Sequence, residues 1–137
     1  MKKIVVLLLI FSIFSCSLSD DTTSSQTVFL PIENVTMPNE FIRNQTHNIT
    51  LSYYKPSSCY VFNSIYSTVT GNETTFAIVT DIHTSNVDCQ QITTESETSF
   101  DFTPTELGSY IFKFWHGVNG TNTGQDVYLE YEIEVVE

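Results

Sequence analysis

A tight corner flanked by alternating aromatic residues, at positions 100–115, limits the possible folds of this chain more than any other feature. Every second residue on each side of the corner is aromatic: Phe100 and Phe102 before it, and Tyr110, Phe112 and Phe114 after it. A repeat of two residues places such a set on one face of a β-sheet. Pro104 and Gly108 mark the turn. The stretch predicts a short strand, a corner and a longer strand.

The corner also carries a motif. Glu106-x-Gly108-x-Tyr110-x-Phe112 resembles the acidic-x-Gly-x-Tyr-x-Cys entry to strand F of immunoglobulin-like sandwiches. In that family the Tyr hydroxyl hydrogen-bonds back to the corner backbone. The resemblance therefore implies that Glu106, Gly108 and Tyr110 form a structural corner. Phe112 stands where antibody domains have a cysteine, so the resemblance is to a cell-surface or bacterial relative that lacks their inter-sheet disulfide.

Five further stretches are expected to be strands: residues 28–38, 47–53, 59–66, 74–83 and 126–137. Pro31 and Pro38 confine the first to a sheet edge or to a strand that switches sheets. In the third, parity places Tyr60 and Ile65 on opposite faces. The last alternates most cleanly, with an apolar set on one side, and Tyr128 and three glutamates on the other. We expect residues 28–137 to form an all-β, immunoglobulin-like two-sheet sandwich of about seven antiparallel strands.

The N-terminus has the features of an export signal. Lys2 and Lys3 precede an apolar run at 4–13, which is too short to span a membrane. The run ends near Ser15-Cys16, which resembles a bacterial lipobox. We therefore expect 1–15 to be a lipoprotein signal peptide, and a lipid bilayer to hold the protein through acylated Cys16. The alternative is ordinary cleavage nearby, with Cys16 discarded or free.

Residues 16–27 are polar and lack periodicity, which predicts a disordered tether. The acidic residues after Cys16 and the run Asp21-Thr22-Thr23 are similar to the surface-export and O-glycosylation signals of Bacteroidota lipoproteins. A plain solvated linker explains both equally well. The resemblance implies a lipid-anchored protein of the cell envelope, at the outer membrane, either periplasmic or surface-exposed.

The charge of the chain limits its partners. All 16 acidic residues follow Ser15, and only Arg43, Lys55 and Lys113 remain basic there, so the mature chain carries 3 − 16 = −13. Such a charge repels nucleic acid and anionic surfaces. A nucleic-acid partner is not expected, whereas a cation, a basic partner or a neutral glycan is compatible.

Cys59 and Cys89 remain once Cys16 is assigned to the anchor, and an even pair in an exported chain predicts a disulfide. Closing a loop of about 30 residues stabilises the fold by roughly 3.5 kcal/mol. No metal site or cofactor is expected. The chain has no CxxC motif, and a group made of Asp81, His83, Asp88 and Asp101 lacks the ligand spacing of a calcium loop.

No nucleophile motif is present, and the three histidines, His47, His83 and His116, are scattered over predicted strands and a loop. We therefore do not expect an enzyme. Glu130, Glu132 and Glu134 form an acidic ladder on the last strand, which either receives a basic partner or blocks edge-to-edge pairing.

Trp115 is the main candidate for binding. Parity with Phe112 and Phe114 points it away from the core, at the mouth of an Asn- and Gly-rich loop at 116–124. An exposed Trp beside such a loop is typical of glycan- or protein-binding patches. We therefore predict a patch of Trp115, His116 and Asn119. The alternative is that Trp115 covers an open end of the sandwich.

These observations predict a membrane-anchored, exported lipoprotein that acts as a non-catalytic binding or adhesion module for a protein or glycan partner. The alternative is a structural accessory subunit of a cell-envelope complex, which would present an unpaired apolar edge at 28–37 or 127–135. Fold alone does not separate the two.

Overall fold

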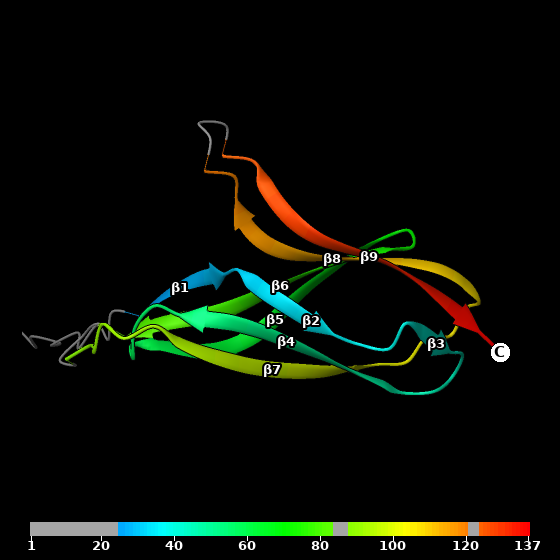
Figure 1. Ribbon diagram of the computed structural model, residues 1–137, viewed down its shortest axis with the longest axis horizontal. Helices are drawn as coiled ribbons and strands as arrows, with labels where there is room; N and C mark the ends of the chain where they lie inside the picture. Colours follow the sequence, from blue (N-terminus) through cyan, green and yellow to red (C-terminus); the bar gives the residue numbers. More distant parts are fainter. Residues whose placement is uncertain (1–24, 84–87, 121–123) are drawn as a thin grey trace, which may run out of the picture.

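The computed structural model describes residues 25–83, 88–120 and 124–137. Within these ranges the chain forms nine strands in two sheets that pack face to face (Figure 1). The predicted all-β sandwich is confirmed. The described ranges contain no helix, and so none that could cross a membrane.

The larger sheet has six strands: β1 (Ser25–Leu30), β3 (Glu40–Ile42), β5 (Tyr60–Thr70), β6 (Glu73–His83), β8 (Gly108–Val118) and β9 (Asp126–Val136). Strand β6 pairs with β5 along one edge, and with β8 and then β1 along the other. Strand β8 pairs in turn with β9, and β9 with β3. The smaller sheet has three strands in the order β2-β4-β7: β2 (Ile32–Thr36), β4 (His47–Lys55) and β7 (Thr94–Phe102).

Two details of the predicted sandwich are wrong. There are nine strands rather than about seven, because the opening stretch divides at Pro31 into β1 in one sheet and β2 in the other, with β3 following. Proline has no N–H to donate to a ladder, so it suits such a crossing. The strands are also not all antiparallel, since β6 pairs with β8, and β3 with β9, in parallel.

The first strand begins inside the range predicted to be the tether. Ser25, Gln26 and Thr27 pair with the end of β6, from His83 back to Asp81. The sandwich therefore includes Ser25, Gln26 and Thr27. The predicted signal peptide, Cys16 and residues 16–24 lie outside the described residues.

The core between the sheets is rich in aromatic rings. Phe41, Phe112 and Phe114 are fully buried, together with Ile32, Ile49, Leu51 and Ile78. Phe100, Phe102 and Tyr110 pack against this core. The alternation predicted around the corner is thus confirmed, as is that of the last strand, where Ile133 and Val135 are buried.

The parity predicted for β5 is wrong. The register between β5 and β6 shifts between Phe62 and Ser64, so Asn63 is an extra residue in the strand. Such a bulge reverses the facing of all later side chains. Tyr60 and Ile65 consequently both pack against the core, and Tyr66 lies on the outer face, where it is 47% exposed.

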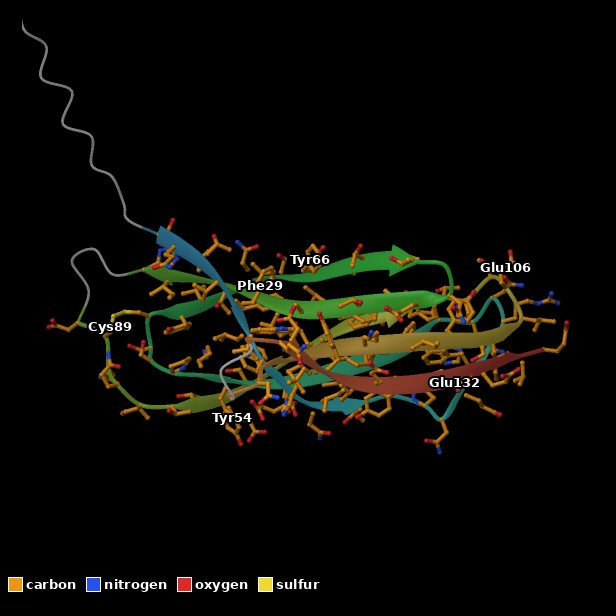
Figure 2. All side chains as sticks on the ribbon, turned by 90° about the horizontal axis from the view of Figure 1, so that it is seen from above. Phe29, Tyr54, Tyr66, Cys89, Glu106 and Glu132 are labelled. Carbon is orange, nitrogen blue, oxygen red and sulfur yellow. A yellow bond between two sulfur atoms is a disulfide. The ribbon has the colours of Figure 1, made fainter. Side chains whose placement is uncertain are left out.

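The predicted disulfide is confirmed. Cys59 and Cys89 are bonded, with a Cα–Cα distance of 5.3 Å. The bridge joins the residue before β5 to the segment before β7, and a hydrogen bond from the Ser58 amide to the Gln90 carbonyl (3.1 Å) supports it. Figure 2 shows Cys89 and Glu106 at opposite ends of the sandwich, so the bridge and the corner lie far apart.

The predicted corner residues lie where β8 begins. Gly108 has a φ of +113°, which favours glycine, and Glu106 is exposed. The Tyr110 ring packs edge-on against Phe102, with centroids 5.8 Å apart. Within the described residues its hydroxyl makes no hydrogen bond to the protein. Buried Pro104 anchors the corner instead, since its carbonyl accepts a bond from the Asn44 amide at 2.8 Å.

Candidate ligand-binding pocket

An open pocket of about 380 Å³ lies on the outer face of the larger sheet. It forms where two strands share one edge of β6: β8 pairs with Glu73–Phe76 and β1 with Ile78–His83. The two strands therefore meet end to end beside Ala77. Beyond this point the β8–β9 hairpin curves away from β1 (Figure 1). The pocket occupies the angle between them.

Four aromatic side chains from four strands line the pocket: Phe29 of β1, Tyr66 of β5, Trp115 of β8 and Tyr128 of β9. Thr75 and Ala77 of β6 and Asp126 of β9 complete the lining. Each aromatic residue occupies an outward position of its strand, next to a residue that faces the core. The sheet thus brings together rings that are far apart in the sequence.

The rings are inclined to one another rather than coplanar. Phe29 lies between two of them: its centroid is 5.9 Å from that of Tyr66 with an interplanar angle of 66°, and 6.2 Å from that of Trp115 with an angle of 61°. Figure 2 shows Phe29 and Tyr66 close together on one side of the sheet. Trp115 and Tyr128 are directly opposite on β8 and β9. Together the rings form a concave aromatic wall.

A single carboxylate holds two of these rings in place. The Trp115 indole donates a hydrogen bond from Nε1 to Asp126 Oδ1 at 2.9 Å, and the Tyr128 hydroxyl donates to Asp126 Oδ2 at 3.5 Å. Partial burial raises the pKa of Tyr128, and the negative charge and hydrogen bond of Asp126 raise it further. Tyr128 is therefore neutral at physiological pH and remains a donor.

A lysine lies beside the pocket, and two carboxylates balance its positive charge. Lys113 Nζ is 3.5 Å from carboxylate oxygens of both Glu73 and Glu130, and 5.1 Å from the centroid of the Tyr128 ring. Desolvation acts to lower the pKa of Lys113, but the two carboxylates outweigh it and the pKa is raised. The ammonium is thus held outside the pocket by its own partners.

Of the predicted patch, only Trp115 lines the pocket. His116 is an extra residue in a bulge between Trp115 and Gly117, and its Nδ1 lies 2.7 Å from the Ile32 carbonyl oxygen of β2. Asn119 lies at the hairpin end, where its amide bonds the Gln125 carbonyl at 2.7 Å. The structure does not bring these two residues to the pocket, because the bulge turns His116 towards β2 and the hairpin carries Asn119 beyond it.

Phe29, Tyr66 and Asp126 line the pocket although the sequence pattern did not indicate them, and for Tyr128 the pattern indicated only an outward position. An outward aromatic residue on a strand was the available signal at Phe29. At Tyr66 that signal is absent, because counting alternate residues from Tyr60 without the Asn63 bulge places Tyr66 on the core face.

Two other polar candidates, His47 and Asp81, have structural partners. The Ile42 amide donates to His47 Nε2 at 2.9 Å. Asp81 accepts hydrogen bonds from the Thr27 hydroxyl and the Asn63 amide, both at 2.7 Å, and these lower its pKa. No group of three or more His, Cys, Asp or Glu side chains within the described ranges is placed to hold a metal ion.

Two glutamates of the acidic ladder already have partners within the larger sheet. Glu130 pairs with Lys113, and Glu132 (labelled in Figure 2) accepts a hydrogen bond from the Ser109 hydroxyl at 2.6 Å. Glu134 aligns with Glu40 on β3, which covers the end of β9.

No protein-family model, curated protein or solved structure matches this chain.

Proposed function

We propose that this protein is a non-catalytic binding module that holds a protein or glycan partner in the aromatic pocket. One observation carries the proposal: four aromatic side chains converge on an open cavity at the surface. Phe29 is 52% exposed and Tyr66 is 47% exposed. Contiguous exposed apolar surface of this kind marks interaction sites on soluble domains.

The carboxylate of Asp126 at the pocket also favours a binding role over a catalytic one. Both oxygens of Asp126 already accept hydrogen bonds, from Trp115 and Tyr128. A carboxylate used in this way fixes the orientation of two rings. Preorganised rings lose little conformational entropy when a ligand arrives, which favours affinity.

We also propose that the module is an exported lipoprotein of the cell envelope, similar to those of Bacteroidota and anchored through Cys16. The charged start, the apolar run and the Ser15-Cys16 junction support this. Labelled palmitate incorporated into the wild-type protein and absent from Cys16→Ser would support the anchor. Equal labelling of both proteins would refute it.

An immunoglobulin-like relationship remains our proposal for the sandwich. Two face-packed sheets and the sharp corner at Gly108 support it. The parallel pairing of β6 with β8 departs from the wholly antiparallel arrangement that we expected.

Fluorescence provides the direct test of the pocket, because Trp115 is the single tryptophan of the chain. The full-length protein is titrated with defined glycans and peptides while acrylamide quenching of Trp115 is followed. A true ligand protects Trp115 from quenching, and Phe29→Ala abolishes that protection. Tyr54→Ala is the matched control, since Tyr54 is an aromatic residue that is 45% exposed on β4 and does not line the pocket. Unchanged quenching with every ligand would refute the proposal.

The accessory-subunit alternative has a separate observation in its favour. Strand β5 pairs only with β6 among the described strands, and Val61, Phe62 and Val69 are exposed on it at 49%, 39% and 68%. This edge was not predicted from the sequence. Of the two that were, 28–37 lies mostly in strands with one described partner each, β1 and β2, whereas β9 is paired with both β8 and β3. Association through β5 would be lost in Val69→Lys, as measured by analytical ultracentrifugation, while Trp115 fluorescence would not change. A monomer at all concentrations, alone and with envelope proteins, would refute this alternative.

A further inference from the structure

We propose that the pocket binds a quaternary ammonium group, that is, a fully alkylated nitrogen cation such as a trimethylammonium head. This inference rests on the proposed function and specifies the chemistry of the ligand. Three properties of the pocket support it: the inclination of its rings, its charge, and the hydrogen bonds that the carboxylate in its lining, Asp126, already accepts.

The inclination of the rings suits a compact, rounded ligand. Phe29 is tilted by 66° from Tyr66 and by 61° from Trp115, so the three rings surround a space instead of forming a flat platform. A sugar stacks best on a single flat ring, whereas inclined rings enclose a quaternary ammonium group, as in aromatic cages. The volume of about 380 Å³ is near the lower end for ligand sites, which suits a head group rather than an oligosaccharide.

The charge around the pocket favours a cation. Asp126 bonds to two of the pocket rings. Glu73 and Glu130 flank Lys113, the single basic residue beside the pocket in the described part of the chain. These three carboxylates exceed the single ammonium by two negative charges. The formal charge of the whole chain is −11, so an anionic ligand would be repelled and a cation attracted.

The pocket rings can hold a cation in the required geometry. Lys113 Nζ already lies 5.1 Å from the centroid of the Tyr128 ring, within the range of a cation–π contact. The electron-rich face of an aromatic ring attracts a cation whether that cation is a side chain or a ligand. The three other rings of the pocket have no such cation among the described residues.

The hydrogen bonds that Asp126 already accepts favour a quaternary over a primary ammonium. A primary ammonium has three N–H donors, and it loses its water when buried unless acceptors replace it. Here both Asp126 oxygens already accept bonds from Trp115 and Tyr128. A quaternary ammonium has no N–H donor and therefore needs none of these acceptors, while it keeps the attraction to rings and carboxylates.

The experiment compares a cation with a neutral molecule of the same shape. Choline and 3,3-dimethylbutan-1-ol are titrated separately into the full chain, and binding is followed by calorimetry and by Trp115 fluorescence. We expect choline to bind at least tenfold more tightly than its neutral isostere. We expect Asp126→Asn, which keeps an acceptor for Trp115, to weaken choline severalfold and leave the isostere unchanged. Tyr54→Ala should bind both as the wild type does, since Tyr54 is exposed on β4 of the smaller sheet and does not line the pocket.

Two further probes identify the source of the head group. A trimethyllysine peptide represents a modified protein, and phosphatidylcholine vesicles represent a lipid surface. Binding of either, with competition by free choline, supports the inference and names the source.

The unfavourable outcomes separate the two proposals. Equal affinity for choline and its isostere, or binding of a neutral glycan alone, would overturn the quaternary ammonium inference and leave the binding-module function standing. No response of Trp115 to any cation, isostere, peptide or glycan would overturn both.

Discussion

Phe112→Ala removes the ring at the centre of the core. Phe112 is fully buried, and its ring contacts four others at centroid distances of 5.1 to 6.3 Å: Phe102, Phe76, Phe41 and Phe114. Phe102 belongs to the smaller sheet and the other three to the larger one. Truncation would therefore open a cavity between the two sheets.

The expected loss follows from this packing. Fully buried Phe→Ala changes lower the free energy of unfolding by about 3–5 kcal/mol, which includes the cavity that remains. Four aromatic contacts are lost at once, and each contributes about 0.5–1.5 kcal/mol beyond area burial, so we expect the upper half of that range. For a domain of about 110 residues, about 4 kcal/mol lowers the melting temperature by roughly 16 °C.

Urea unfolding followed by circular dichroism measures this loss. We expect the midpoint to fall while the m-value, which reports the surface exposed on unfolding, stays the same. Val69→Ala, at a position that is 68% exposed, serves as the control and should change stability by less than about 0.5 kcal/mol. A loss below about 1 kcal/mol for Phe112→Ala would refute the reasoning, because it would mean that this ring is not packed between the sheets.

Three further predictions concern the bridge, the pocket and the β8 bulge. Replacing both cysteines of the disulfide by serine should lower the free energy of unfolding by about 3.5 kcal/mol, and the reduced wild type should unfold at the same urea concentration. Tyr128 has a raised pKa, so it adds stability below a pH of about 10 that is lost as the pH rises through that pKa. Asp126→Asn should move its titration, followed by phenolate absorbance, to lower pH, and an unchanged titration would contradict the assigned contact. Gly117 has a φ of +105° and an added Cβ would meet a proline side chain at 3.4 Å, so Gly117→Ala should destabilise the fold by about 1–3 kcal/mol. Gly120→Ala, which has open space around it, should melt as the wild type does.

Local periodicity explains what could be predicted correctly. The prediction for β9 depended only on the alternation of apolar and polar residues, and Ile133 and Val135 of the apolar set are buried. The same reasoning placed Phe112 and Phe114 in the core and Trp115 away from it. The disulfide followed from counting cysteines, since only one pair remained after Cys16 was assigned to the anchor.

Bulges explain where the prediction of faces failed. Asn63 in β5 and His116 in β8 each add one residue to a strand. A single extra residue reverses parity, and nothing in the local sequence marks it. The face of Tyr66 and the direction of His116 were therefore not predictable, and both decide which residues line the pocket.

The sequence by itself determined the all-β class, the inward set of each regular strand and the cysteine pair, because these depend on the spacing of residues along one chain. Only the tertiary structure decided that β1 and β8 meet end to end along β6. That arrangement brings Phe29, Tyr66, Trp115 and Tyr128 together around one pocket. It depends on hydrogen bonds between strands far apart in sequence, and local patterns do not specify which strands pair.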